Sequence, residues 1–84
     1  MMPIEQVRKL LHGGFPGGRI EVANPQGDGE HYQVLIVSDR FLDKTMVEQH
    51  QLVYQVLGDA MRQAIHALAL KTYTQAQWAK SGAR

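Results

Sequence analysis

The spacing of apolar residues constrains this fold most strongly, because it switches between helical and alternating patterns along the chain. Ile4, Val7 and Leu11 recur at helical spacing, whereas Ile20 and Val22 alternate with polar residues as in a half-buried strand. The predicted elements are helices over residues 3–12, 45–64 and 74–80 and strands over residues 19–24, 30–39 and 65–72. For a single domain of 84 residues, the simplest α+β solution is a three-stranded sheet with helices packed on one face.

Turn-forming residues separate these elements. Residues 25–29, Pro-Gln-Gly-Asp-Gly, favour a turn throughout, so the first two strands are expected to form an antiparallel hairpin. Gly13 and Gly14 are expected to end the first helix. Residues 14–17, Gly-Phe-Pro-Gly, match the G-x-x-G pattern of nucleic-acid-binding KH domains in form only. The KH loop joins two helices, whereas this segment leads from a helix into a strand.

Two capping boxes mark the starts of the later helices. Thr45 with Glu48, and Thr74 with Gln77, have the spacing at which a hydroxyl and a side-chain carbonyl or carboxylate satisfy two free backbone N–H groups. Gly58 lies inside the long helical segment, which therefore either bends there or divides into two shorter helices. The apolar face expected for this segment carries Met46, His50, Val53, Leu57, Ala60 and Ala64.

Composition excludes several classes of function. Lys and Arg number 9 against 8 Asp and Glu, and the net charge of +1 gives no strong field for nucleic acid. The chain has no cysteine, which excludes disulfides and thiolate metal sites within it. No signal peptide is recognisable, and the longest apolar run is too short to span a bilayer, so the sequence predicts a soluble, cytoplasmic protein.

The histidines are the strongest candidates for chemistry. His12 falls in the last turn of the first helix, where a cation complements the helix dipole. His50 lies on the apolar face of the long helix and is expected to be packed and hydrogen-bonded. His66 alternates with Leu68 and Leu70 but stands at the start of its strand, where the sheet meets solvent. A structural and a functional role therefore both remain open for His66.

The remaining polar residues give weaker signals. His31 begins the second strand and is expected to be an ordinary surface residue, and Asp28 is expected to form the preceding turn. No nucleophile elbow, zinc-protease motif or phosphate-binding loop is present, and the carboxylates form no evident acid–base pair. The sequence thus gives no positive indication of an enzyme.

The segment VSDRFLDKTMVEQHQLVYQVLGD, followed by IHALALKTYTQAQWAK, resembles the BolA family. That family has a phenylalanine soon after the second strand, a helix with an R-H-x-x-V-like segment, an I-H-A-L strand and a T-P-x-x-W helix. The resemblance runs from about Tyr32 to Trp78, with the motifs in the same order. Gln49-His50 stands in place of R-H, and Gln75 in place of the proline.

The resemblance implies a class II KH-like fold and a non-enzymatic adaptor that works with a monothiol glutaredoxin. In such pairs a [2Fe-2S] cluster is bridged between the two proteins. The glutaredoxin and glutathione supply thiolates, and the BolA member supplies a histidine, which here is His66. The isolated chain is expected to bind no cluster. Many members place a second ligand in the hairpin loop, and in this chain either Asp28 or His31 would take that role.

An alternative implied by the resemblance is a DNA-binding transcriptional regulator. Its binding surface would be the KH-like fold or a helix-turn-helix around Gly58, and its basic residues would be Arg40, Lys44, Arg62 and Lys71. The free chain is expected to be a monomer or a weak homodimer, with no membrane partner.

Overall fold

The computed structural model describes residues 4–25, 27, 31–59 and 67–82 of the chain. In order, these residues form α1 (Ile4–Gly14), β1 (Arg19–Ala23), β2 (His31–Val37), the short 3-10 helix η1 (Asp39–Phe41), α2 (Met46–Leu57), β3 (Ala67–Tyr73) and α4 (Gln75–Ser81). None of the helices among these residues is long and apolar enough to cross a membrane.

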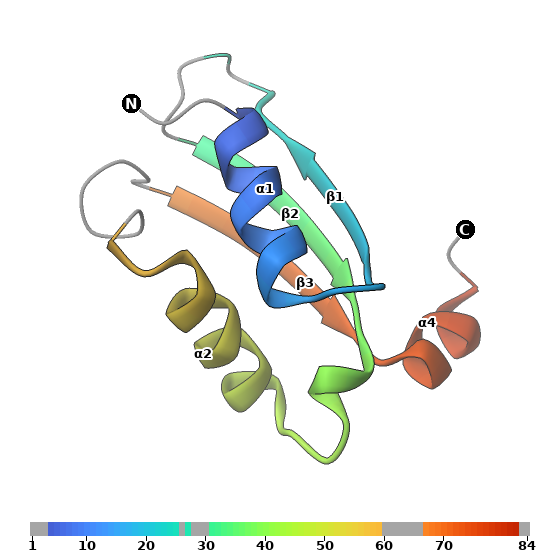
Figure 1. The fold of residues 1–84 in the computed structure, drawn as a ribbon. Coiled ribbons are helices and arrows are strands. Elements are labelled where there is room, and N and C mark those ends of the chain that lie inside the picture. Colours follow the sequence, from blue (N-terminus) through green and yellow to red (C-terminus); the bar gives the residue numbers. More distant parts are fainter. Residues whose placement is uncertain (1–3, 26, 28–30, 60–66, 83–84) are drawn as a thin grey trace.

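The three strands form one mixed sheet in the order β1-β2-β3 (Figure 1). β1 and β2 pair antiparallel, which confirms the predicted hairpin. β2 and β3 pair parallel. A parallel pair needs a long crossover between its strands, and α2 lies within that connection. The predicted α+β fold with a three-stranded sheet is therefore confirmed.

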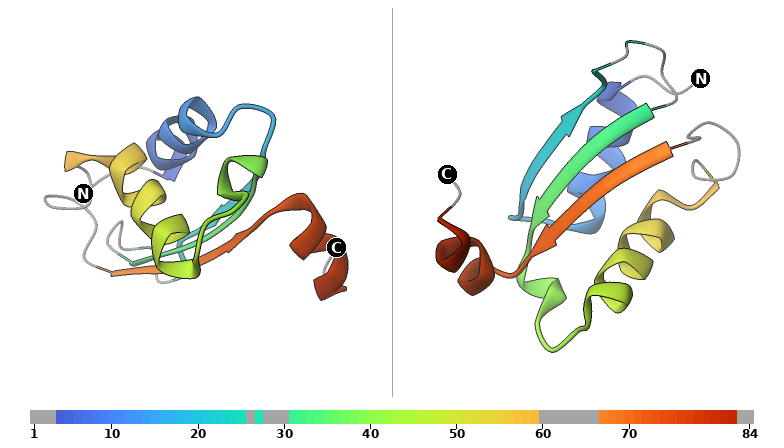
Figure 2. Two further views of the ribbon diagram at one scale, coloured as in Figure 1. Left: turned by 90° about the horizontal axis from the view of Figure 1, so that it is seen from below. Right: turned by 180° about the vertical axis from the view of Figure 1, so that it is seen from behind.

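Both α1 and α2 pack on the same face of the sheet and leave the other face open (Figure 2). The core lies between these two layers. It consists of Val7, Leu11 and Phe15 from the first helix and its end, Tyr32, Val34 and Ile36 from the central strand, and Phe41, Val53 and Leu57. The helices on one face follow the prediction from apolar spacing.

The last helix is the exception to that layer. α4 lies beyond the end of the sheet rather than over its face (Figure 2). Trp78 meets the ring of Tyr73 edge-on, with centroids 5.3 Å apart. On the same indole, the Arg19 guanidinium carbon lies 5.3 Å from the ring centroid. Trp78 thus anchors α4 by aromatic contact, and the helices that cover one face of the sheet are α1 and α2.

The first helix ends at Gly14, the second of the two glycines that were predicted to end it. Neither Gly13 nor Gly14 has the positive φ of a left-handed cap. A Cβ atom added at Gly14 would clash with both γ-carbons of Val56. Gly14 therefore serves as a close-approach point between the helices. Its carbonyl also accepts a hydrogen bond from the Arg40 guanidinium, which lies over the ring of Phe15.

The long predicted helix ends as α2 at Leu57. Gly58 caps it with φ of 57°, a left-handed value that favours glycine. α2 thus ends at Gly58, as the alternative of two shorter helices predicts. Residues 60–64, which would form the second of them, lie outside the described residues. Val53 and Leu57 are buried as predicted, but Met46 is 59% exposed.

A polar residue, Gln49, takes the buried place next to Val53 in α2. Only 2% of Gln49 is exposed. Its side-chain Nε2 donates to the Lys44 carbonyl at 3.2 Å, and its Oε1 accepts from the Thr72 hydroxyl at 2.6 Å. Because both ends of the amide are satisfied, Gln49 can be buried at low cost, and it ties the start of α2 to the end of β3.

Both predicted capping boxes are present, and the first is charged. The Thr45 backbone N–H donates to the Glu48 carboxylate at 2.8 Å and lowers the pKa of Glu48 from its ordinary value of 4.5. A lowered folded-state pKa stabilises the fold above the unfolded-state pKa, and this contribution is lost as the pH falls through the folded value.

We therefore expect Glu48→Gln to lower the free energy of unfolding at pH 7 and to have a smaller effect at pH 3. Urea unfolding at the two pH values measures the difference. Gln77→Ala in the second, uncharged box is the control, and its effect should not depend on pH. A Glu48→Gln effect that is equal at both pH values would contradict the charged role of this box.

Candidate functional site

His31, the one candidate ligand that the structure describes, lies at the end of the sheet where β2 and β3 begin. His31 is the first residue of β2, is half-buried, and pairs in register with Ala67, the first described residue of β3. In the sequence, His66 directly precedes Ala67. Both His66 and Asp28 lie outside the described residues, so of the three predicted ligands the structure places only His31.

This end of the sheet is supported by the core beneath it. Tyr32 follows His31, is 2% exposed and pairs with Leu68. Because successive residues of a strand point to opposite faces, burial of Tyr32 among the core residues directs the His31 side chain to the open face. Among the described residues, no group of three or more His, Asp or Glu side chains is placed to hold a metal ion.

Asn24, which directly follows β1, is a residue that the sequence analysis missed. Its side-chain Oδ1 is buried and has no hydrogen-bond partner among the described residues. Ala23 pairs with Gln33, so Asn24 lies at the same end of the sheet as His31. An asparagine beside a Pro-Gln-Gly turn is ordinary turn chemistry, and no sequence signal distinguishes a buried acceptor from an exposed one.

The other two described histidines lie elsewhere. His12 is exposed in the last turn of α1, as predicted. His50 is half-buried on α2, but its Nε2 is sealed from solvent and has no hydrogen-bond partner within the described part of the chain. For this nitrogen, the described residues do not supply the hydrogen bond that was expected of His50.

The basic residues of the DNA-binding alternative do not gather on one described surface. Arg40 bonds to the Gly14 carbonyl on the side of the sheet that the helices cover. Lys71 pairs with Leu35 of β2, and because its neighbour Thr72 is buried under the helices, Lys71 faces the open side of the sheet. Lys44 is exposed between η1 and α2, and Arg62 falls in a segment that the structure does not describe.

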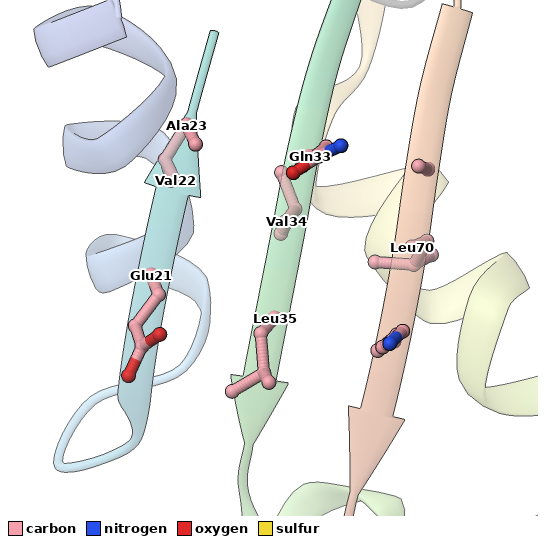
Figure 3. Close-up of a pocket in the computed structure, with 9 residues that line it drawn as sticks. Glu21, Val22, Ala23, Gln33, Val34, Leu35 and Leu70 are labelled. Carbon is pink, nitrogen blue, oxygen red and sulfur yellow. The ribbon is translucent and has the colours of Figure 1, made fainter. Parts of the chain in front are cut away.

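The open face carries a shallow hollow of about 510 Å³ that crosses all three strands (Figure 3). Polar and charged residues of its lining are Glu21, Gln33 and Lys71, and the rest of the lining is apolar. Glu21 is already paired with Arg19, whose guanidinium lies 2.7 Å from the carboxylate. The hollow therefore has a mixed polar and apolar lining and no concentration of one charge.

The chain is a small α+β protein with an antiparallel hairpin, a parallel crossover through α2 and two helices on one face of the sheet. The BolA-like protein family model matches residues 11–77, and the chain belongs to this family. The DNA-binding transcriptional regulator BolA of Escherichia coli K12 is 33% identical over 85 residues, which cover 93% of this chain and 81% of that protein.

Solved structures agree with this assignment. A BolA protein homologue from Coxiella burnetii is 31% identical, with a TM-score of 0.77, and the match covers 94% of this chain and 99% of that one. The BolA domain of SufE1 from Arabidopsis thaliana is 28% identical, with a TM-score of 0.72, and the match covers 87% of this chain and 92% of that domain. These likenesses support the resemblance seen in the sequence.

Proposed function

We propose that this chain is a non-enzymatic adaptor in iron–sulfur cluster handling, which forms a [2Fe-2S]-bridged heterocomplex with a monothiol glutaredoxin through His66. Glutaredoxin and glutathione would supply thiolates, and this chain would supply an imidazole nitrogen to one iron. His31 or Asp28 would be the second contact from this chain. When bound, the cluster supplies electron storage that no side chain of this protein has.

The observation that carries this proposal is the register of β2 against β3 in a chain that belongs to the BolA-like family. His31 pairs with Ala67, the residue that follows His66 in the sequence. This register supports a site at the end of the sheet where β2 and β3 begin. The chain has no cysteine, so a cluster that contacts it needs thiolates from another molecule.

An imidazole ligand gives such a complex two physical properties. A neutral imidazole in place of a thiolate removes negative charge from one iron, which raises the reduction potential, as in Rieske centres. Protonation of the ring removes the lone pair that binds iron, so the heterocomplex is expected to weaken in acid. Both properties suit a cluster that is shared between proteins and can be transferred.

The test is a titration of a cluster-loaded monothiol glutaredoxin with this chain, followed by visible absorption and circular dichroism. We expect the spectrum to change and to saturate at a fixed ratio of the two proteins, and the heterocomplex to appear by analytical ultracentrifugation. The apo-glutaredoxin is the control and should form no coloured complex. An unchanged spectrum without a heterocomplex would contradict the proposal.

The Escherichia coli relative is a DNA-binding transcriptional regulator, and this favours DNA binding as a second candidate function. The charge of the chain, +1, supports only weak binding. If the chain binds duplex DNA, the affinity should fall steeply with salt because phosphate contacts release counterions. Arg40 bonds to Gly14 on the side that the helices cover, whereas Lys71 faces the open side, so a single DNA surface would use only one of them. No binding at low salt removes this candidate.

A further inference from the structure

Met46 combines an exposed side chain with contact to a buried polar pair. It is 59% exposed at the start of α2. Its Sδ nevertheless lies 3.7 Å from the hydroxyl of Thr72, which is 3% exposed at the end of β3. The methionine therefore reaches from solvent to the contact between the helix and the edge strand.

The hydroxyl of Thr72 has one proton, and it donates this proton to Oε1 of Gln49. The distance from Thr72 Oγ1 to Gln49 Oε1 is 2.6 Å, well within the range of a strong hydrogen bond, whereas the 3.7 Å contact to sulfur is a weak one. Gln49 in turn donates to the Lys44 carbonyl. The hydrogen bond from Thr72 to Gln49 therefore links β3 to α2.

We propose that Met46 is a reversible oxidation site that acts on the Thr72–Gln49 hydrogen bond. A hydroperoxide is the oxidant. A sulfur lone pair attacks one peroxide oxygen, the O–O bond breaks, and a sulfur–oxygen bond forms. Sulfur loses two electrons, and the peroxide is reduced to water or an alcohol. A sulfoxide reductase can reverse the change.

The consequence follows from the acceptor strength of the product. A thioether sulfur is a weak acceptor, whereas a sulfoxide oxygen is a strong one. The sulfoxide oxygen next to Thr72 competes with Gln49 for the single hydroxyl proton. Because Gln49 is 2% exposed, its Oε1 then loses its donor without gaining water. Loss of one buried donor raises the unfolded-to-folded ratio on the order of tenfold.

Met46 also belongs to an exposed apolar surface at the start of the second helix, with Leu42 (55% exposed) and Val47 (66% exposed). Oxidation therefore places a polar group on this surface as well as at the buried pair. The proposal does not depend on the iron–sulfur function, since it concerns the opposite end of β3 from Ala67.

The experiment treats the full chain with hydrogen peroxide and follows Met46 oxidation by peptide mass spectrometry. The Gln49 side-chain amide resonances and the urea midpoint are measured before and after. We expect the amide resonances to shift and the unfolded-to-folded ratio to rise about tenfold. Methionine sulfoxide reductase should restore both. Met46→Leu is the control for oxidation of Met1, Met2 and Met61, and peroxide should leave its Gln49 resonances in place.

Thr72→Val and Thr72→Ser separate the hydrogen bond from simple loss of packing. In Thr72→Ser, which keeps the hydroxyl, oxidation should shift the Gln49 resonances as in the wild type. In Thr72→Val the shift should be lost although Met46 is still oxidised. The proposal is overturned if full oxidation of Met46 leaves the Gln49 resonances unchanged. It is also overturned if the shift persists in Thr72→Val or in Met46→Leu.

Discussion

Gly14→Ala is expected to lower the free energy of unfolding by about 1–3 kcal/mol, although alanine normally favours a helix over glycine. The added Cβ would lie 2.4 Å and 2.7 Å from the two γ-carbons of Val56. Valine is stiff about χ1, so it cannot rotate both methyl groups away from the new atom. The two helices must therefore separate, and the core between them loses contact.

The neighbouring Gly13 provides a matched control, because it lies in the same helical turn and nothing lies within 4 Å of an added Cβ. Gly13→Ala is expected to raise the free energy of unfolding by about 0.5–1 kcal/mol. Val56→Ala combined with Gly14→Ala should recover part of the loss. Urea unfolding measures all three variants, and equal effects at the two glycines would contradict the close packing of α1 and α2.

His66→Ala is expected to abolish the spectral change that the wild-type chain produces in a cluster-loaded monothiol glutaredoxin. Removal of the imidazole takes away the nitrogen that the proposal assigns to iron, and no cysteine can replace it. The control is His12→Ala, because His12 is exposed in the last turn of α1 and has no assigned role in the cluster. Backbone circular dichroism of each variant checks that the fold is retained.

The same titration identifies the second contact. If His31→Ala weakens the heterocomplex and Asp28→Ala does not, the histidine is the further ligand, and the reverse result selects the aspartate. A wild-type spectral change with His66→Ala would show that the histidine assignment is wrong, while an effect of His12→Ala equal to that of His66→Ala would show a nonspecific loss of structure.

The order of the elements could be predicted because local signals agree with one another. The alternation in β1 and β2, the turn residues between them and the two threonine capping boxes all depend on residues near in sequence. Contacts between distant segments were not predictable in this way. Gly14 is typical of a helix end by its type, but only the structure shows that it also lets α1 and α2 approach closely at Val56.

Burial along α2 likewise depends on contacts with distant segments that the local sequence does not reveal. Periodicity placed Met46 with Val53 and Leu57, but the structure buries Gln49 and exposes Met46. A buried glutamine needs partners for both ends of its amide, and these come from Lys44 and Thr72, of which Thr72 is distant in sequence. No spacing rule predicts a buried polar residue in a helix when its hydrogen-bond partner lies in a strand that is distant in sequence.

The candidate site was predicted from the sequence mainly through the family motif around His66. The structure adds that His31 pairs with Ala67, which depends on the parallel register of β2 and β3. The buried oxygen of Asn24 could not be anticipated, since no local sequence signal distinguishes a buried turn asparagine from an exposed one. Whether Asp28 or His31 is the second ligand stays a prediction.

The central claim is that a histidine nitrogen of this chain binds a cluster whose thiolates belong to other molecules. The most direct measurement labels only this chain with ¹⁵N-histidine, forms the heterocomplex with unlabelled glutaredoxin and glutathione, and reduces the cluster to its paramagnetic state. Electron–nuclear double resonance should then detect a strongly coupled ¹⁵N nucleus, and His66→Ala should remove it. A reduced heterocomplex without any coupled ¹⁵N would contradict the account.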